Sequence, residues 1–388
     1  MPPVYDHYNY DQLVVSDPVR LREVCQALRA AGAFAVDTEF IREHSYKPRL
    51  CLVQVATADT IALLDPLTID LSEFWPLVTD PTIVKVAHAG AQDWEMCFQS
   101  SGLPPANMFD VQIAAGLAGL PYPMSYGRLV QQIFDVEIPQ GHSFSDWLRR
   151  PLTPRQLEYA AMDVAYLMPA YEWLRQRLDE RGRLDWLRQE MLPFEGTELY
   201  WCEPQHAWRK VRGLGRLSPT ELGVLRELAV WREKAAAIAD LPARTFLNDQ
   251  ALVALARAKP NSTAAVAACR FMPRPLAAQH GRDIIQAIQL GLATPKDKLP
   301  KLPKAPPPLD GDKDLVNRLA AAGAQHCLAN QLTPELFSPK HGYTELARAL
   351  TAKRKSAEPL HLLTGWRKPL TLEILAHSDT GLPTPQDP

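Results

Sequence analysis

The chain has 388 residues, 46% of them hydrophobic, and a formal net charge of -2. At about 100–200 residues per domain, this length predicts two or three domains. No apolar run approaches the roughly 18 residues of a membrane helix, and the N-terminus lacks the basic-then-apolar layout of a secretory signal. We therefore expect a cytoplasmic protein without membrane contact. The six cysteines form no CxxC pair and the ten histidines show no ligand spacing, which argues against zinc and for reduced thiols.

Charge is distributed unevenly along the chain. Residues 1–204 carry 16 Lys+Arg against 28 Asp+Glu, a net of -12, whereas residues 205–304 carry 17 against 7, a net of +10. An acidic block beside a basic block suits a metal-binding catalytic unit joined to a phosphate-binding unit. Chance drift in surface composition is the alternative interpretation.

The first part of the chain predicts a sheet flanked by helices. A helical stretch over 19–31 ends at Gly32 and leads into an apolar strand over 33–40. Two more apolar segments, 50–56 and 60–65, follow after short polar connections and predict an antiparallel meander. A helix around 71–78 precedes a strand over 83–88, and helical patterns dominate from Asp93 onward. The expected fold class is α/β, a mixed sheet with helices around it.

Beyond about residue 205 the sequence shows no convincing strand and several helix starts. Ser218-Pro219-Thr220-Glu221 forms a capping box with proline at the first helical position. The Pro- and Lys-rich segment 295–309 predicts an extended linker. Thr333-Pro334-Glu335 and residues 343–352 indicate another small helical unit, before a tail expected to be disordered. The expected divisions are 1–204, 205–294, 295–309, 310–378 and 379–388.

Asp37 and Glu39 are the first candidate site residues. They lie two apart on a predicted strand, so both carboxylates point to one face. A divalent cation such as Mg²⁺ or Mn²⁺ would relieve their repulsion. Taken alone, such a pair at a strand end is often only solvent-facing.

Two later segments add acidic groups. Asp93 falls in the first turn of a helix, where a carboxylate often only complements the helix dipole. A capping box, Thr153-Pro154-Arg155-Gln156, fixes the start of a further helix. On that helix Tyr159 and Asp163 are one turn apart, opposite an apolar stripe, although a solvent-facing pair is the bland alternative. The stripe comprises Leu157, Ala160, Ala161, Val164 and Met168.

Together these groups suit phosphodiester hydrolysis. Acidic residues from separate segments can hold two metal ions about 3.5–4 Å apart. One ion would lower the pKa of an attacking water, and both would neutralise the developing charge. Tyr159 would orient that water and help to accept its proton.

Three segments resemble the exonuclease motifs of the ribonuclease D family, in the DEDD superfamily. They are Asp37-Thr38-Glu39-Phe40, His88-Ala89-Gly90 with Asp93, and Tyr159-Ala160-Ala161-Met162-Asp163. Their order makes the resemblance specific, and residues 49–54, 109–112 and 145–152 also match sequences of the family. The resemblance implies a ribonuclease H-like fold for the exonuclease domain. It also implies an HRDC-type helical domain over 205–294 and a second, divergent one that contains Gly365-Trp366-Arg367.

The resemblance also implies roles for residues. Asp37, Glu39, Asp93 and Asp163 would bind two divalent metal ions, Mg²⁺ or Mn²⁺, and Tyr159 would position the water. Glu158 stands where the histidine branch of the superfamily has His, which places the chain in the tyrosine branch. Ribonuclease D proteins often carry a lysine and an arginine between Glu137 and Asp146, where this chain has Gln140 and Phe144. A lost cation there would weaken phosphate contact or alter substrate preference.

The expected function is that of a 3′-to-5′ exoribonuclease that releases nucleoside 5′-monophosphates. Its expected partners are RNA 3′ ends, in tRNA precursors and other small structured RNAs, with no obligate protein partner. The alternatives are a DNA-directed exonuclease of the same chemistry and a non-catalytic RNA-binding protein. A solvated basic surface and a buried Phe40 are the competing interpretations of the candidate nucleic-acid contacts, which are Phe40, His88, Trp208, Arg209, Lys210 and Arg212.

Overall fold

A computed structural model describes residues 10–138, 146–200, 203–302, 312–352 and 360–377. The chain divides into two compact units. Unit 1 comprises Met1–Glu39, Cys51–Thr197 and Pro307–Pro388, and unit 2 comprises Phe40–Leu50 and Glu198–Pro306. Within the described ranges, no helix combines the length and the apolar character needed to cross a bilayer. The expectations for Gln140, Phe144 and the tail 379–388 lie outside the described residues.

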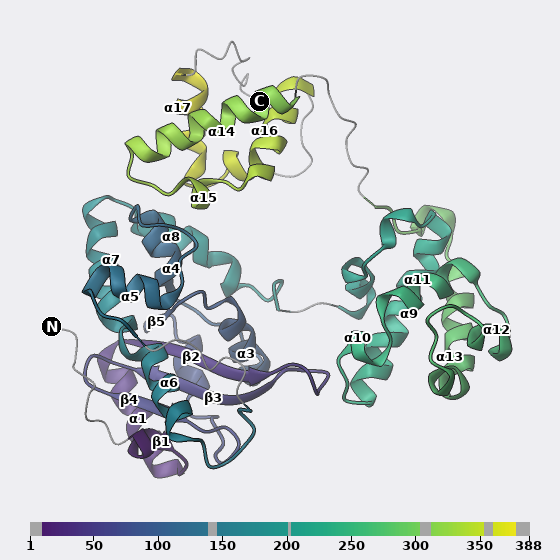
Figure 1. Ribbon diagram of the computed structural model, residues 1–388, viewed down its shortest axis with the longest axis horizontal. Coiled ribbons are helices and arrows are strands. Elements are labelled where there is room, and N and C mark those ends of the chain that lie inside the picture. Colours follow the sequence, from purple (N-terminus) through teal and green to yellow (C-terminus); the bar gives the residue numbers. More distant parts are fainter. Residues whose placement is uncertain (1–9, 139–145, 201–202, 303–311, 353–359, 378–388) are drawn as a thin grey trace. The chain divides into compact units, whose positions relative to one another are not determined.

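A mixed sheet forms the centre of unit 1, as the sequence predicts, and it has six strands, two more than the sequence indicated (Figure 1). The strand order is β1-β4-β3-β2-β5-β6. β3 and β4 pair antiparallel, whereas β1–β4, β2–β5 and β5–β6 are parallel pairs. The strands are β1 (Val14–Val15), β2 (Ala33–Ile41), β3 (Arg49–Ala56), β4 (Ile61–Leu64), β5 (Val84–Ala87) and β6 (Met108–Asp110).

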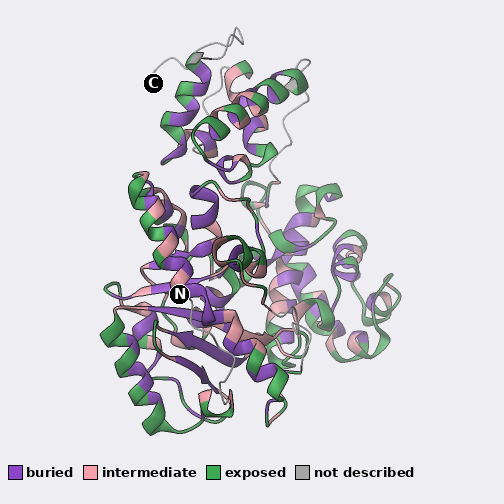
Figure 2. Ribbon diagram, turned by 60° about the vertical axis from the view of Figure 1, so that its left-hand side comes forward, coloured by how far each residue is buried: buried purple, intermediate pink, exposed green. Residues whose placement is uncertain are grey.

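Helices flank this sheet, and buried residues follow its strands (Figure 2). The first helix ends as expected, because Gly32 takes the left-handed conformation, φ 67°, that closes a helix without strain. The second begins at Trp75 rather than Leu71, since Leu71 and Phe74 form a hydrogen-bonded turn before it. The helices are η1 (Tyr10–Leu13), α1 (Pro18–Ala31), α2 (Trp75–Thr79), α3 (Ala91–Ser101), α4 (Val111–Leu117), α5 (Tyr126–Phe134), α6 (Pro154–Ala165), α7 (Leu167–Glu180), α8 (Leu184–Met191) and η2 (Leu192–Glu195).

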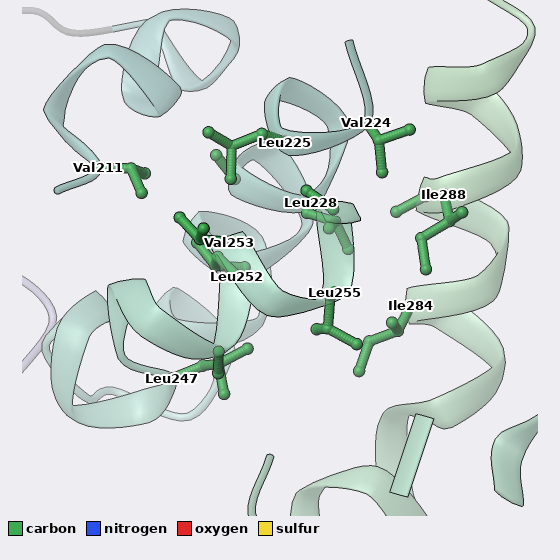
Figure 3. Packing of buried hydrophobic residues seen from close by; sticks show 14 of the residues in the cluster. Val211, Val224, Leu225, Leu228, Leu247, Leu252, Val253, Leu255, Ile284 and Ile288 are labelled. Carbon is green, nitrogen blue, oxygen red and sulfur yellow. The ribbon is translucent and has the colours of Figure 1, made fainter. Parts of the chain in front are cut away.

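All regular secondary structure in the described residues 203–302 is helical, and the helices pack around one apolar core (Figure 3). The capping box at Ser218 forms as predicted. α9 and α13 approach closely, since a Cβ on Gly291 would lie 2.4 Å from the Cα of Val224. The elements are η3 (Pro204–Lys210), η4 (Leu214–Arg216), α9 (Pro219–Ile238), α10 (Ala243–Phe246), α11 (Asp249–Ala258), α12 (Thr263–Ala267), α13 (Arg274–Leu292) and η5 (Lys296–Lys298).

The C-terminal helices belong to unit 1 and dock on α8. The indole rings of Trp186 and Trp366 stack with centroids 4.7 Å apart. The Trp366 Nε1 donates a 2.7 Å hydrogen bond to Glu190, and Arg367 donates another of 2.6 Å to the same carboxylate. These helices are α14 (Asp312–Ala329), α15 (Pro334–Phe337), α16 (Lys340–Ala352), η6 (His361–Leu363) and α17 (Arg367–His377).

Arg183 makes a second attachment between these helices and the α/β layer. Its guanidinium donates to the carbonyl oxygens of Leu117 at 2.7 Å and Gln331 at 2.9 Å, and also to that of Asn330. A planar guanidinium with several fixed donors suits this bridging of carbonyl groups. The C-terminal helices are thus an integral part of unit 1.

Removal of the Arg367 side chain tests this docking. The Arg367→Ala change removes a guanidinium group, only 9% exposed, that donates to Glu190 and to the Phe337 carbonyl; Glu190 keeps the Trp366 indole as a donor. We expect the free energy of unfolding to fall by about 3–5 kcal/mol, as for other broken buried ion pairs. Urea denaturation followed by tryptophan fluorescence measures it. The adjacent exposed Lys368→Ala is the control and changes stability by less than about 0.5 kcal/mol; equal losses would contradict the role of Arg367.

Candidate active site

Three carboxylates meet beside the C-terminal half of β2. Asp37 and Glu39 lie on that strand and Asp163 on α6, and one oxygen of each lies within 4.8 Å of the others. Strand alternation turns Asp37 and Glu39 to the same face. The capping box and buried stripe of α6 leave Asp163 outside the core. Residues 124 positions apart in sequence thereby form one acidic group.

Asp93 lies beside this group but outside the set of three. It is 7% exposed in the first turn of α3, and its Oδ1 accepts a 2.5 Å hydrogen bond from the Thr38 hydroxyl. Thr38 was not among the expected site residues, although it stands between Asp37 and Glu39. Asp93 is close enough for its charge to raise the pKa of Asp37.

Burial and mutual repulsion make full ionisation of these groups unfavourable. Burial, followed by the charges of Asp93 and Asp163, raises the pKa of Asp37 well above its usual range. The same causes, burial first, raise the pKa of Glu39 to about 9. Burial raises the pKa values of Asp93 and Asp163 to about 7, against the lowering effect of hydrogen bonds from Thr38 and Tyr159. A cation among these oxygens would reverse the balance.

The donor set fits a divalent metal ion. Hard cations such as Mg²⁺ take carboxylate oxygens, and three are present within 4.8 Å. The buried Oδ2 of Asp163 has no hydrogen-bond partner among the described residues. An unsatisfied buried carboxylate oxygen that faces other carboxylates is a strong acceptor for a metal ion.

Tyr159 stands one turn before Asp163 on α6, with its ring 6.1 Å from that of Trp147. Burial, then the charge of Asp163, raises the pKa of its phenol above the usual range. The phenol therefore stays protonated at working pH.

Arg150 fastens the segment that leads into α6. Its guanidinium donates two hydrogen bonds to the Asp65 carboxylate, at 2.6 and 2.7 Å, and one of 2.7 Å to the Cys51 carbonyl. Cys51 lies on β3, and Asp65 directly follows β4. Arg150 thus ties the start of α6, and with it Tyr159 and Asp163, to the sheet.

Asp110 does the same for the turn before α3. Its carboxylate accepts hydrogen bonds from the backbone N–H groups of Ala89 at 3.1 Å, Gly90 at 3.0 Å and Gln112 at 2.9 Å. Ala89 has φ 54°, and a Cβ on Gly90 would lie 2.7 Å from that of Ala87. One buried carboxylate therefore caps α4 and holds the strained turn that places Asp93. The sequence signal was an Asp at a strand end with helix-cap character.

Two of the expected nucleic-acid contacts, Phe40 and His88, belong to the exonuclease motifs in the sequence. Phe40 is partly exposed, and the guanidinium carbon of Arg42 lies 4.7 Å from its ring centroid. The Nε2 of His88 lies 2.9 Å from the Met124 carbonyl oxygen, and burial lowers the pKa of His88. A neutral His88 that bonds Met124 supports the local fold and carries no charge toward a phosphate.

The other four expected contacts lie in the helical part of unit 2, residues 203–302, and differ in exposure. Trp208 is 6% exposed and belongs to the apolar core, which argues against a stacking role for its ring. Arg209, Lys210 and Arg212 are exposed. Of these four expected contacts, the three basic residues are therefore accessible to a nucleic-acid backbone, whereas Trp208 is not.

Comparisons with known proteins identify both parts of the chain. The 3′-5′ exonuclease family matches residues 13–179, and the HRDC domain family matches residues 221–288. A ribonuclease D of Gluconacetobacter diazotrophicus is 34% identical over 363 residues, which cover 92% of this chain and 90% of the relative. A ribonuclease D of Pseudomonas paraeruginosa is 34% identical over 359 residues, with 91% and 94% covered.

A solved structure supports the same family. The crystal structure of Escherichia coli RNase D, described as an exoribonuclease involved in structured RNA processing, superimposes with a TM-score of 0.81. The two chains are 28% identical, and the match covers 94% of this chain and 97% of the other.

Replacement of Asp110 tests the clamp on α3. Asp110→Asn places an NH₂ group against N–H donors that now bond a carboxylate, so the turn before Asp93 loses its hold. We expect an exonuclease rate about 10- to 100-fold lower and a higher Mg²⁺ concentration for half-maximal rate, as for other supports of metal ligands. The exposed cap residue Asp17→Asn is the control. A rate loss with unchanged metal dependence would leave Asp110 a purely structural residue.

Stability without metal should depend on pH. Raised folded-state carboxyl pKa values mean that the native protein binds more protons than the unfolded chain between about pH 4.5 and 9. Stability in EDTA should therefore fall as pH rises through this window. Thermal melting measures it, and we expect Mg²⁺ to restore several degrees at pH 8 and almost nothing at pH 5. A melting temperature in EDTA that stays level or rises from pH 5 to 9 would contradict this electrostatic picture.

Proposed function

This chain belongs to the ribonuclease D family, and we propose that it trims the 3′ ends of tRNA precursors and other small structured RNAs with two divalent metal ions. It is a 3′-to-5′ exoribonuclease by its relatives and its fold. The observation that most supports the two-ion chemistry is the convergence of Asp37, Glu39 and Asp163, with Asp93 alongside. Water adds to the terminal phosphorus, the P–O3′ bond breaks, and a nucleoside 5′-monophosphate leaves.

The residues of the chain have separate tasks in this reaction. Asp37, Glu39, Asp93 and Asp163 would hold the ions, Mg²⁺ or Mn²⁺. Once bound, the ions lower the pKa of the attacking water and neutralise the charge that develops at phosphorus and at the leaving oxygen. Tyr159, protonated and one turn from Asp163, would orient the water.

RNA is the proposed polymer because the relatives are ribonucleases, whereas the carboxylates themselves do not sense a 2′-OH. The phosphodiester chemistry is common to RNA and DNA. The choice between the two polymers therefore depends on parts of the protein other than the acidic group.

The test uses a 5′-labelled tRNA precursor and a DNA of matched sequence, with Mg²⁺. We expect a ladder that shortens from the 3′ end of the RNA and stops at structured regions. Asp37→Ala should lower the rate at least 1000-fold, and Tyr159→Phe about 100-fold, in keeping with loss of a group that acts on the water. Exposed Asp59→Ala, in the turn between β3 and β4, is the control and keeps full rate.

Three outcomes would count against the proposal. Faster loss of the DNA would reassign the substrate, and full activity in EDTA would remove the metal ions. Equal turnover by wild type and Asp37→Ala, or none by either, would defeat the catalytic assignment.

A further inference from the structure

A hollow of about 690 Å³ opens on the helical part of unit 2. Its wall includes four arginines and a phenylalanine, here called the arginine hollow: Arg212, Arg216, Arg257, Arg270 and Phe271. We propose that the arginine hollow binds single-stranded RNA, with phosphates on its guanidinium groups and a base against Phe271. This inference rests on the proposed function only in taking RNA as the polymer.

The charge of the hollow is uncompensated. All four arginines are exposed, and no Asp or Glu lines the hollow. Among the described residues, none of the four guanidinium groups has a hydrogen-bond or ion-pair partner. Four like charges around one space repel each other, so an anion with several negative groups would be stabilised there.

The nearest acidic side chain does not neutralise these arginines. Asp249 accepts a 3.1 Å hydrogen bond from the backbone N–H of Arg212 but is 7% exposed. Its carboxylate is already paired with Arg232 at 2.7 Å and with Arg244 at 3.2 Å. Asp249 therefore holds the loop that presents Arg212 and leaves the guanidinium free.

Phe271 supplies an exposed ring beside these cations. Its side chain is 45% exposed, and its backbone lies in the left-handed region at φ 66°, which is unfavourable for a residue with a Cβ. The guanidinium carbon of Arg270 lies 4.6 Å from the ring centroid. An aromatic ring and planar guanidinium groups offer stacking and phosphate contact together, which suits unpaired nucleotides. A duplex offers no open base face, so the ring favours a single strand.

Two other hollows of unit 2 lack this combination. One is lined by Glu203 and Glu227 among its basic residues, and Arg226 lies 2.8 Å from Glu227. The other has Arg274 and Arg282 but no aromatic residue. The second of these provides a matched control, because it allows the same charge to be removed from the same unit.

The test measures binding apart from cleavage. All variants carry Asp37→Ala in the full chain, and a 5′-fluorescein 20-nucleotide unstructured RNA is titrated in EDTA by fluorescence anisotropy. We expect Arg216→Ala/Arg257→Ala to weaken binding about tenfold or more. The slope of log Kd against log salt should fall by about 1.4, since each lost phosphate contact on a single strand contributes about 0.7. The control Arg274→Ala/Arg282→Ala should stay within about twofold of the parent.

Phe271→Leu separates stacking from charge. It keeps an apolar side chain but removes the aromatic face, so we expect roughly tenfold weaker binding with an unchanged salt slope. Thermal melting of each variant identifies loss of fold. If melting shows that Phe271→Leu is unfolded, the arginine pair and its control still decide the proposal.

Several outcomes would overturn the arginine hollow. Equal weakening by both arginine pairs would indicate general charge attraction, and no weakening by either would remove the site. A 20-residue poly-glutamate can be added as a competitor. If it displaces the labelled RNA at a lower concentration than unlabelled RNA does, and only from the protein that keeps all four arginines, the hollow would be assigned to an acidic protein segment. Hydrolysis of a trinucleotide RNA by the chain with Asp37 intact is scored separately, so failure of the proposed function is distinguishable from failure of this site.

Discussion

Repulsion among the carboxylates beside the C-terminal half of β2 is the constraint on which the rest of unit 1 depends. Asp37, Glu39 and Asp163 are held within 4.8 Å of one another, and burial raises the pKa of each. Such a group would separate if its backbone supports were soft. Two polar clamps hold Asp163 and the neighbouring Asp93 in place. Arg150 ties the start of α6 to β3 and to Asp65, and Asp110 ties the start of α3 to that of α4.

The two clamps both fix the start of a helix, one with a positive and the other with a negative side chain. The Arg150 guanidinium gathers acceptors, and the Asp110 carboxylate gathers backbone donors. Each joins a helix start to a strand end, where hydrogen-bonding groups would otherwise lack partners. The two clamps therefore hold the helices that carry Asp93 and Asp163, whereas Asp37 and Glu39 are placed by β2 itself. Precision at the site comes from charge-assisted hydrogen bonds rather than from the carboxylates themselves.

Local rules predicted most of this arrangement from sequence, and long-range packing accounts for the rest. Period-two alternation placed Asp37 and Glu39 together, and a capping box fixed the helix of Asp163. No local rule links Thr38 to Asp93, which lie 55 positions apart. Trp208 was expected to contact nucleic acid because it stands among basic residues. The short η3 helix instead turns its side chain into the core, while Arg209 faces solvent. The attachment of α17 to α8 joins residues 177 positions apart and left no periodic signal.

The uneven charge of the chain gives its two parts different dependences on ions. A polymer of phosphates is repelled by the net -12 of residues 1–204 and attracted by the net +10 of residues 205–304. Bound divalent ions remove part of the first charge, at the place where the scissile phosphate must come. Monovalent salt acts mainly on the second, because it screens guanidinium–phosphate contacts and weakens the gain from counterion release. Under the proposed function, metal ions would govern access to chemistry, whereas ionic strength would govern how firmly the rest of the RNA is held.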